Sequence, residues 1–315
     1  MAADDNDRMN SPRADAIPLA TPLASAFDGA TRLADWGVIR ARGPEAAHFL
    51  QGQLTQDAEH LPEGLLRLAG YCSAKGRLLA SFVMWRNGPE DILLACSADL
   101  LPAVLKRLTM FVLRAKCKLS DASAELPLWG LAGSAAALSG ARQLPDAAVA
   151  GAVVPRALSV GADAPAAQPL DIETWRWLEV HSGVARIVAA TAEQFVPQMV
   201  NLELVGGVNF QKGCYPGQEI VARSQYRGTL KRRAQLVYSA APLQPGQEIF
   251  HSADPEQPAG MVVLAASFEG RHAALVEVKL AALAPAAGGS LHAVSALGPL
   301  LTLAALPYSF PTEAA

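Results

Sequence analysis

The chain has 315 residues, of which 51% are hydrophobic and 17% charged, and a formal net charge of −3. This length and apolar content predict two or three globular domains, and the near-neutral charge provides no overall attraction for nucleic acid. No apolar stretch reaches the roughly 18 residues of a membrane helix. Residues 1–25 carry acids and prolines, unlike a signal peptide. We therefore expect a cytoplasmic protein without a membrane segment, whose residues 1–25 form a flexible tail.

Four cysteines are scattered along the chain without a Cys-x-x-Cys pair: Cys72, Cys96, Cys117 and Cys214. This usage suits a reducing compartment and argues against a disulfide scaffold. It also argues against a self-contained zinc site, so we expect no metal site.

The first half of the chain is predicted to form strands and two helices. Pro44 suits the first turn of a helix over 44–53. Ser97 is expected to cap a second helix that runs to Val112, with Leu101, Leu105 and Leu108 on one face. The predicted strands span residues 33–40, 66–72, 77–85, 91–96 and 116–120.

The second half begins with a predicted strand over 126–133, followed by an Ala/Gly/Pro-rich stretch over 134–169 to which we assign no elements. Asp171 is predicted to open a helix that Gly183 stops. From 236 to 310, short apolar runs alternate with turn residues, which predicts a small β-barrel or sandwich.

An unusual cluster of reactive residue types occupies 212–219, with the sequence Lys-Gly-Cys-Tyr-Pro-Gly-Gln-Glu. A nearby cation such as Lys212 favours the reactive thiolate of Cys214. Pro216 is expected to begin a helix whose N-terminus points back at the sulfur. The glycines would allow a close approach to a ligand, and the polar side chains add acid–base capacity. The candidate functional residues are Lys212, Gly213, Cys214, Tyr215, Gly217, Gln218 and Glu219.

A simpler alternative is that Cys214 is a small buried apolar residue and that the glycines only form a turn. No histidine lies near Cys214 in the sequence, so a Cys–His nucleophile pair is not supported.

A basic run without an acid follows the loop. It could contact a polyanion such as RNA or the glutamate tail of a folate, or it could be a solvated connector. Its members are Arg223, Arg227, Lys231, Arg232 and Arg233.

The stretch 210–223, with the motif Lys-Gly-Cys-Tyr-Pro-Gly-Gln-Glu, resembles the signature of the YgfZ family, folate-binding proteins related to the glycine-cleavage T-protein, an aminomethyltransferase. Other matching stretches span most of the chain in the same order. They lie at 33–36, 49–57, 74–77, 197–202 and 306–309.

The resemblance implies an α+β, T-protein-like architecture, in which two interleaved α+β domains and a C-terminal β-barrel surround a central folate cavity. The first domain would combine 26–45 with 125–200, and the second 46–124 with 201–232. The barrel would comprise 233–315.

The resemblance also implies a cofactor and a role. Tetrahydrofolate or a related folate would bind Trp36 and Trp177, although Trp175 beside Trp177 leaves that choice open; an indole face suits stacking on such rings. Lys212 and Cys214 would be the key functional pair and would face the folate cavity. The implied role is in iron–sulfur cluster assembly or repair, with an indirect effect on tRNA modification, so that the partners would be iron–sulfur client enzymes or assembly factors.

One departure from the aminomethyltransferases concerns a carboxylate that assists methylene transfer. The aligned stretch 76–81 has Ala80 and Ser81 at the acidic positions. Losing a positioned acid–base group removes roughly 10²–10⁴-fold in rate. Asp57 is the nearest acid in a matching motif, and we do not assign it that role. Aminomethyl transfer is therefore disfavoured, and whether the protein is an enzyme stays open.

Three functions remain to be compared. The first is a folate-binding accessory factor for iron–sulfur assembly, in which Cys214 acts on sulfur, iron or a cluster. The second is a tetrahydrofolate-dependent one-carbon transferase. The third is a tRNA-binding module based on the basic run.

Overall fold

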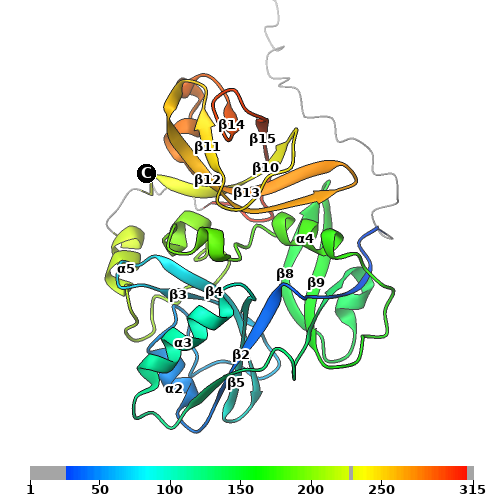
Figure 1. The fold of residues 1–315 in the computed structure, drawn as a ribbon, viewed down its shortest axis with the longest axis vertical. Helices are drawn as coiled ribbons and strands as arrows, with labels where there is room; N and C mark the ends of the chain where they lie inside the picture. Colours follow the sequence, from blue (N-terminus) through cyan, green and yellow to red (C-terminus); the bar gives the residue numbers. More distant parts are fainter. Residues whose placement is uncertain (1–25, 227–229, 311–315) are drawn as a thin grey trace, which may run out of the picture.

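The structure is a computed structural model that describes residues 26–226 and 230–310. The expected tail over 1–25 and the basic residue Arg227 lie outside the described residues. A C-terminal barrel sits above two sheet-containing units (Figure 1).

The first sheet has four antiparallel strands in the order β1-β7-β9-β8. Two of them, β8 and β9, form a hairpin in the stretch to which the sequence assigned no elements. Ala150 and Gly151 occupy its turn with φ of 49° and 82°, a pair of positive values that normally selects asparagine and glycine. The strands are β1 (Gly29–Arg32), β7 (Leu128–Ala132), β8 (Arg142–Val149) and β9 (Ala152–Val160).

The second sheet has five antiparallel strands in the order β3-β4-β5-β2-β6. Its strands confirm the predictions over 66–72, 77–85, 91–96 and 116–120 to within a few residues. They are β2 (Trp36–Arg42), β3 (Arg67–Cys72), β4 (Leu78–Gly88), β5 (Asp91–Ser97) and β6 (Lys118–Asp121).

The strand predicted over 33–40 begins too early. The chain turns between β1 and β2, and β2 begins at Trp36. β1 pairs with β7 in the first sheet, whereas β2 pairs with β5 and β6 in the second. The segment 26–45 is thus divided between the two sheets, although the expected division assigned it to one domain. The division of the chain into domains stays a prediction.

Two helices belong to the second unit, α2 (Ala46–Gln51) and α3 (Leu101–Val112). The expected cap at Ser97 is wrong: α3 begins after Leu100 without a side-chain cap. Ser97 is the last residue of β5, and its hydroxyl accepts a hydrogen bond from Arg186 at 3.2 Å.

Helix α4 (Ile172–His181) confirms the prediction for the stretch after Asp171. The Asp171 carboxylate accepts the backbone N–H of Glu173 at 2.7 Å, and Gly183 follows the helix with φ of 67°. One face of α4 packs on the barrel strand β12, where Trp177 lies 5.9 Å from the ring centre of Phe268. The helix therefore joins the first sheet to the barrel.

Six strands close the C-terminal barrel in the order β10-β13-β12-β11-β14-β15, which confirms a small barrel in this part of the chain. They are β10 (Arg232–Ser239), β11 (Glu248–His251), β12 (Asp254–Phe268), β13 (Arg271–Lys279), β14 (Leu291–Ala293) and β15 (Leu300–Ala304).

Tyr308 follows the last barrel strand and ties the barrel to the rest of the molecule. Its hydroxyl donates to the carbonyl oxygen of Gly183 at 2.7 Å and accepts from the Asn201 side chain at 3.2 Å. Burial raises the pKa of Tyr308 to about 12, so its hydroxyl keeps its proton as a donor. Among the described residues, no helix is long and apolar enough to span a membrane.

Candidate functional site

The motif over 212–219 runs into helix α5 (Gln218–Tyr226), whose first two residues are Gln218 and Glu219. The expectation that Pro216 begins this helix is wrong, because Gly217 interposes a left-handed residue with φ of 80°. A Cβ on Gly217 would lie 2.4 Å from the backbone oxygen of Ser73. Glycine is therefore required there for both its conformation and its size.

Cys214 is exposed, which contradicts the alternative that it is a buried apolar residue. Cys72 and Cys96 are buried, and burial raises the pKa of each thiol to about 12. Cys117 is partly buried, and burial raises its pKa to about 11. The thiol of the loop is thus the one exposed cysteine of the four.

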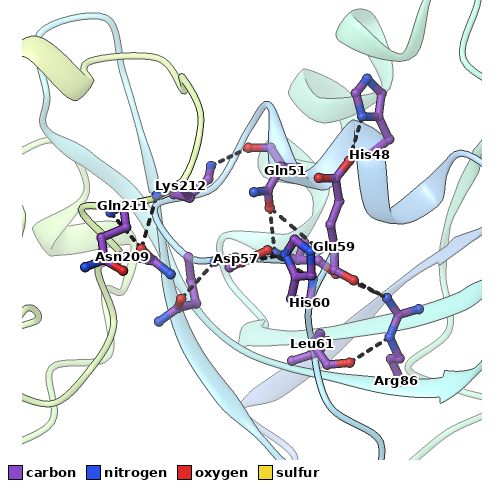
Figure 2. A network of polar contacts seen from close by, with 12 residues as sticks. His48, Gln51, Asp57, Glu59, His60, Leu61, Arg86, Asn209, Gln211 and Lys212 are labelled. Carbon is purple, nitrogen blue, oxygen red and sulfur yellow. Dashed lines mark hydrogen bonds and ion pairs between the residues drawn. The ribbon is translucent and has the colours of Figure 1, made fainter.

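Lys212 is buried beneath the loop and points away from solvent. Its ammonium donates to the backbone oxygens of Gln51 and of Leu54, the latter at 2.7 Å, and lies 4.9 Å from the ring centre of Tyr215. Burial lowers the pKa of Lys212 to about 8, and the nearby Asp57 carboxylate opposes this shift. The lysine therefore fastens the loop to the turn that follows α2 (Figure 2).

Asn209 is a further residue that shapes the loop and that the sequence did not single out. Its side-chain oxygen accepts the backbone N–H groups of Gln211 and Lys212 at 2.8 and 3.1 Å. Its own backbone N–H donates to the oxygen of Thr55 at 2.8 Å. An asparagine three residues before the lysine is a turn signal that sequence inspection can detect.

The turn after α2 is held by its own polar network (Figure 2). The Gln51 side-chain oxygen accepts the N–H of Ala58 at 2.8 Å. Burial raises the pKa of Asp57, but hydrogen bonds from the backbone and ring of His60 outweigh it and hold that pKa below its usual value. The Asp57 carboxylate thus stabilises this turn through its bonds to His60.

A third segment, the turn around Gly76, completes the site. A Cβ on Gly76 would lie 2.8 Å from the Cβ of Ile220 in α5. The three stretches 49–57, 74–77 and 209–219 therefore meet at one place, although they are far apart in the sequence.

A small cavity lies beside β2, β4 and α4, with Trp36, Trp175, Arg156, Glu179 and Arg186 in its lining. Its free volume is about 30 Å³, which suffices for one or two water molecules. Arg156 is buried there with its guanidinium 5.3 Å from the Trp175 ring centre, and it donates to the backbone oxygen of Pro145. Burial lowers the pKa of Arg156 to about 10.

A larger groove of about 510 Å³ adjoins this cavity and is lined by Asp35, Arg176, Leu264 and other residues. Glu179 and Arg186 line both spaces and form a two-pronged ion pair, with N···O distances of 2.7 and 2.9 Å. Burial lowers the pKa of Arg186, but the carboxylates of Glu179 and Asp35 raise it by more. The pKa of Arg186 therefore lies above its usual value. The Arg186 guanidinium also lies 5.0 Å from the ring centre of Trp36. This pair separates the cavity from the groove.

The two expected folate tryptophans lie in different surroundings. Trp36 lines the small cavity, whereas Trp177 lines neither the cavity nor the groove. Trp177 is buried 4.4 Å from His181 and 6.2 Å from Tyr238, measured between ring centres. Trp175 lines the cavity instead. Burial lowers the pKa of His181 to about 4, so the ring is neutral in this apolar contact.

Neither Lys212 nor Cys214 lines the small cavity or the groove. That this pair faces a folate cavity stays a prediction. At the position of the missing transferase acid, Ser81 lines the small cavity, and its hydroxyl accepts the N–H of Ile187 at 2.9 Å. Glu179 is the carboxylate that lines this cavity, and no motif in the sequence singled it out.

The basic run is divided by the fold. Arg233 pairs with the buried Glu203, and Arg232 pairs with the buried Glu277 at 2.8 Å, so these two side chains serve the interior. Arg223 and Lys231 are exposed. Within residues 26–226 and 230–310, no group of three or more His, Cys, Asp or Glu side chains is arranged to hold a metal ion.

Several bacterial proteins are similar to this chain, while no protein-family model matches it. The tRNA-modifying protein YgfZ of Serratia proteamaculans is 33% identical over 225 residues, which cover 64% of this chain and 68% of that protein. The YgfZ protein of Edwardsiella ictaluri is 37% identical over 230 residues, with the same coverage. That of Pectobacterium atrosepticum is 31% identical over 253 residues, covering 71% and 75%.

The fold is similar to that of the glycine cleavage system aminomethyltransferase T from Bartonella henselae. The TM-score is 0.59 at 15% sequence identity, over 90% of this chain and 86% of that one. At this identity, the likeness concerns the fold alone. The chain therefore belongs to the YgfZ family and has the α+β architecture of the aminomethyltransferase T-protein.

Proposed function

We propose that the protein binds tetrahydrofolate or a related folate and acts in the cytoplasm as an accessory factor for iron–sulfur cluster assembly or repair. The observation that carries the folate proposal is the pair of indoles, Trp36 and Trp175, beside a groove large enough for a ligand. Ligand sites typically measure about 300–1,000 Å³, and the groove measures about 510 Å³.

The residues of this region fit a folate in their chemistry. The indole N–H groups of Trp36 and Trp175 are buried and have no hydrogen-bond partner among the described residues, and an unpaired buried donor costs about 1–3 kcal/mol. The cations Arg176 and Arg186 in the groove would bind the carboxylates of a glutamate tail in exchange for their present partners Asp35, Glu173 and Glu179. A bound folate would supply a planar ring for stacking and carboxylates for these cations.

The small cavity alone is too small for a fused ring. We infer that the ring enters from the groove side and that the Arg186 guanidinium moves off the Trp36 face to admit it. The ion pair between Glu179 and Arg186 would then break, and both side chains would contact the ligand instead. Trp177 supports α4 against the barrel in this arrangement and does not touch the ring.

Titration with tetrahydrofolate tests this proposal through tryptophan fluorescence. We expect saturable quenching in the wild type and at least a tenfold weaker affinity in Trp36→Phe and Trp175→Phe. Trp177→Phe serves as the matched control and should keep the wild-type affinity. An absence of saturable quenching in the wild type would refute the folate assignment.

The second part of the proposal concerns Cys214, which is exposed on a loop that Lys212 anchors from beneath. A single thiol cannot complete a four-thiolate cluster site, so a partner would have to supply the other ligands. The test is complementation of a deletion strain, with the activity of an iron–sulfur enzyme as the readout. We expect Cys214→Ser to fail and Cys117→Ser to complement. Full complementation by Cys214→Ser would end the proposed role of this thiol.

The two other functions have weaker support. Ser81 provides a hydroxyl where a transferase would place a carboxylate, so one-carbon transfer lacks its acid–base group. The tRNA-binding alternative retains only Arg223 and Lys231 as exposed cations of the described basic run.

A further inference from the structure

The C-terminal turn of α3 exposes apolar side chains that the fold does not use. Met110, Phe111 and Leu113 are 65%, 45% and 85% exposed. The core-facing side of the same helix is formed by Leu101, Val104 and Leu108, all of which are buried. The three exposed side chains are therefore not among the buried residues that pack the helix on the core.

Leu113 also adopts a backbone conformation that leucine disfavours. Its φ and ψ are +46° and −105°, and the N–H of Ala115 donates to the oxygen of Val112 at 2.8 Å. This is the geometry of a type II′ turn with Leu113 at the position where glycine is preferred. A glycine would serve the turn with less strain, so the leucine side chain has no evident role within the fold.

Cations surround these apolar side chains, and residues 100–120 contain no acid although the whole chain carries a net charge of −3. All five cations are exposed, and none forms an ion pair with the described residues; Arg107 contacts the Tyr71 hydroxyl. Together with Met110, Phe111 and Leu113 we call them the α3 patch. The cations are Lys106, Arg107, Arg114, Lys116 and Lys118.

The patch lies on an outer flank of the molecule, away from the barrel (Figure 1). It continues onto β6, which pairs with β2 at the edge of the second sheet. None of its residues lines the small cavity or the groove of the proposed folate site. The patch is thus separate from that site.

We propose that the α3 patch docks a partner protein, through a segment that combines acidic side chains with two or three apolar ones. Charge complementarity identifies the acidic component, since five cations gather that form no ion pair among the described residues; the one carboxylate recorded beside them, that of Glu45, accepts the backbone N–H of Lys116. The exposed Met110, Phe111 and Leu113 identify the apolar component, because aromatic residues and methionine are enriched at protein interfaces. This inference does not depend on the proposed folate or iron–sulfur role.

Other occupants fit the patch less well. RNA would use the cations but would leave Met110 and Leu113 without apolar partners. A membrane surface requires a long apolar helix face, whereas the apolar face of α3 is buried in the core. A second copy of the chain would bring two basic patches together, which is electrostatically unfavourable.

The test places a photo-crosslinking amino acid at Leu113 in the full-length protein, expressed at its native level, and irradiates the cells. The matched control carries the same group at Leu297, which is 96% exposed and lies in the barrel region. We expect a protein adduct at position 113 whose crosslinked peptide, identified by mass spectrometry, is acidic and contains apolar residues. The double charge reversal Arg114→Glu with Lys116→Glu should reduce that adduct at least tenfold.

The crosslinked segment is then synthesised as a peptide and its affinity for the purified protein is measured. Leu113→Gln and the double charge reversal should each weaken binding at least tenfold, whereas Leu297→Gln should leave it unchanged. Thermal unfolding of each variant verifies that it is folded. An adduct no stronger than at position 297, or an adduct with RNA, lipid or a second copy of the chain, would overturn the proposal.

Discussion

The Nζ atom of Lys212 donates a 2.7 Å hydrogen bond to the backbone oxygen of Leu54, which lies 158 residues earlier in the chain. This bond and the second one to Gln51 join the cysteine loop to the turn after α2. The lysine therefore holds the loop in place, while the thiol of Cys214, two residues later, is exposed to solvent.

Because Lys212 is buried, its stability contribution depends on pH. Its pKa falls from 10.5 to about 8 in the folded protein. Between these values the unfolded chain binds more protons than the folded chain, so this group makes stability rise with pH from about 8 to about 10.5. Below pH 8, where Lys212 is protonated in both states, the free-energy cost of burying its ammonium does not change with pH. Thermal unfolding between pH 7 and 10.5 should show a more positive slope for the wild type than for Lys212→Met. Equal slopes would show that the ammonium is not desolvated.

The two glycines of the loop should respond differently to substitution. Gly217→Ala places a Cβ 2.4 Å from the Ser73 oxygen at a φ of +80°, and we expect it to lower the free energy of unfolding by about 1–3 kcal/mol. Gly213→Ala is the matched control, because no atom lies within 4 Å of its added Cβ. Urea unfolding compares the two variants. Similar losses in both would contradict the close packing of Gly217 on the turn around Gly76.

Thiol labelling should distinguish Cys214 from the other cysteines. It is exposed, whereas Cys72 and Cys96 are buried with pKa values raised to about 12. In the native protein at pH 7.5, an alkylating reagent followed by mass spectrometry should modify Cys214 first. The buried pair should react only on the timescale of unfolding. Rapid labelling of Cys72 or Cys96 would show that the second sheet opens.

The basic run should separate into structural and surface cations. Arg233→Met leaves the buried Glu203 without its ion-pair partner, and removing one partner of a buried pair costs about 3–5 kcal/mol. Arg223→Met should change stability by no more than about 0.5 kcal/mol, as is usual for surface positions. Chemical denaturation measures both. A tRNA-binding test must therefore reverse the charge at Arg223 and Lys231, since reversal at Arg232 or Arg233 would damage the fold.

Local signals in the sequence predicted several elements correctly. Elements that depend on residues far away in the sequence were missed. Asp171 and Gly183 define the ends of α4 through contacts within a few residues, so the helix was predictable. The β8–β9 hairpin was not, because its turn uses Ala150 at a positive φ, where asparagine is the usual signal. The pairing of β2 with β5 was not predictable either, because its partner residues lie between 49 (Arg42 with Asp91) and 61 (Trp36 with Ser97) positions away.

The same distinction applies to the candidate site. The thiol in the motif at 212–219 is exposed, whereas the partners of Lys212 lie in a turn far away in the sequence. Trp175 and Trp177 are two positions apart on one helix and therefore point to different sides. Only the packing of α4 shows that Trp175 faces the cavity and Trp177 the barrel. Arg232 and Arg233 similarly find their carboxylates 45 and 30 residues away.

The contacts of Tyr308 have a consequence for the order of biosynthesis. Its hydroxyl secures Gly183 at the end of α4 and Asn201 ahead of the cysteine loop. A nascent chain can assemble both sheets before this tyrosine is translated, but the end of α4 then lacks the hydrogen bond from Tyr308 to Gly183. The groove should therefore reach its final shape only after translation has passed the barrel, so an incomplete chain would not bind the proposed folate.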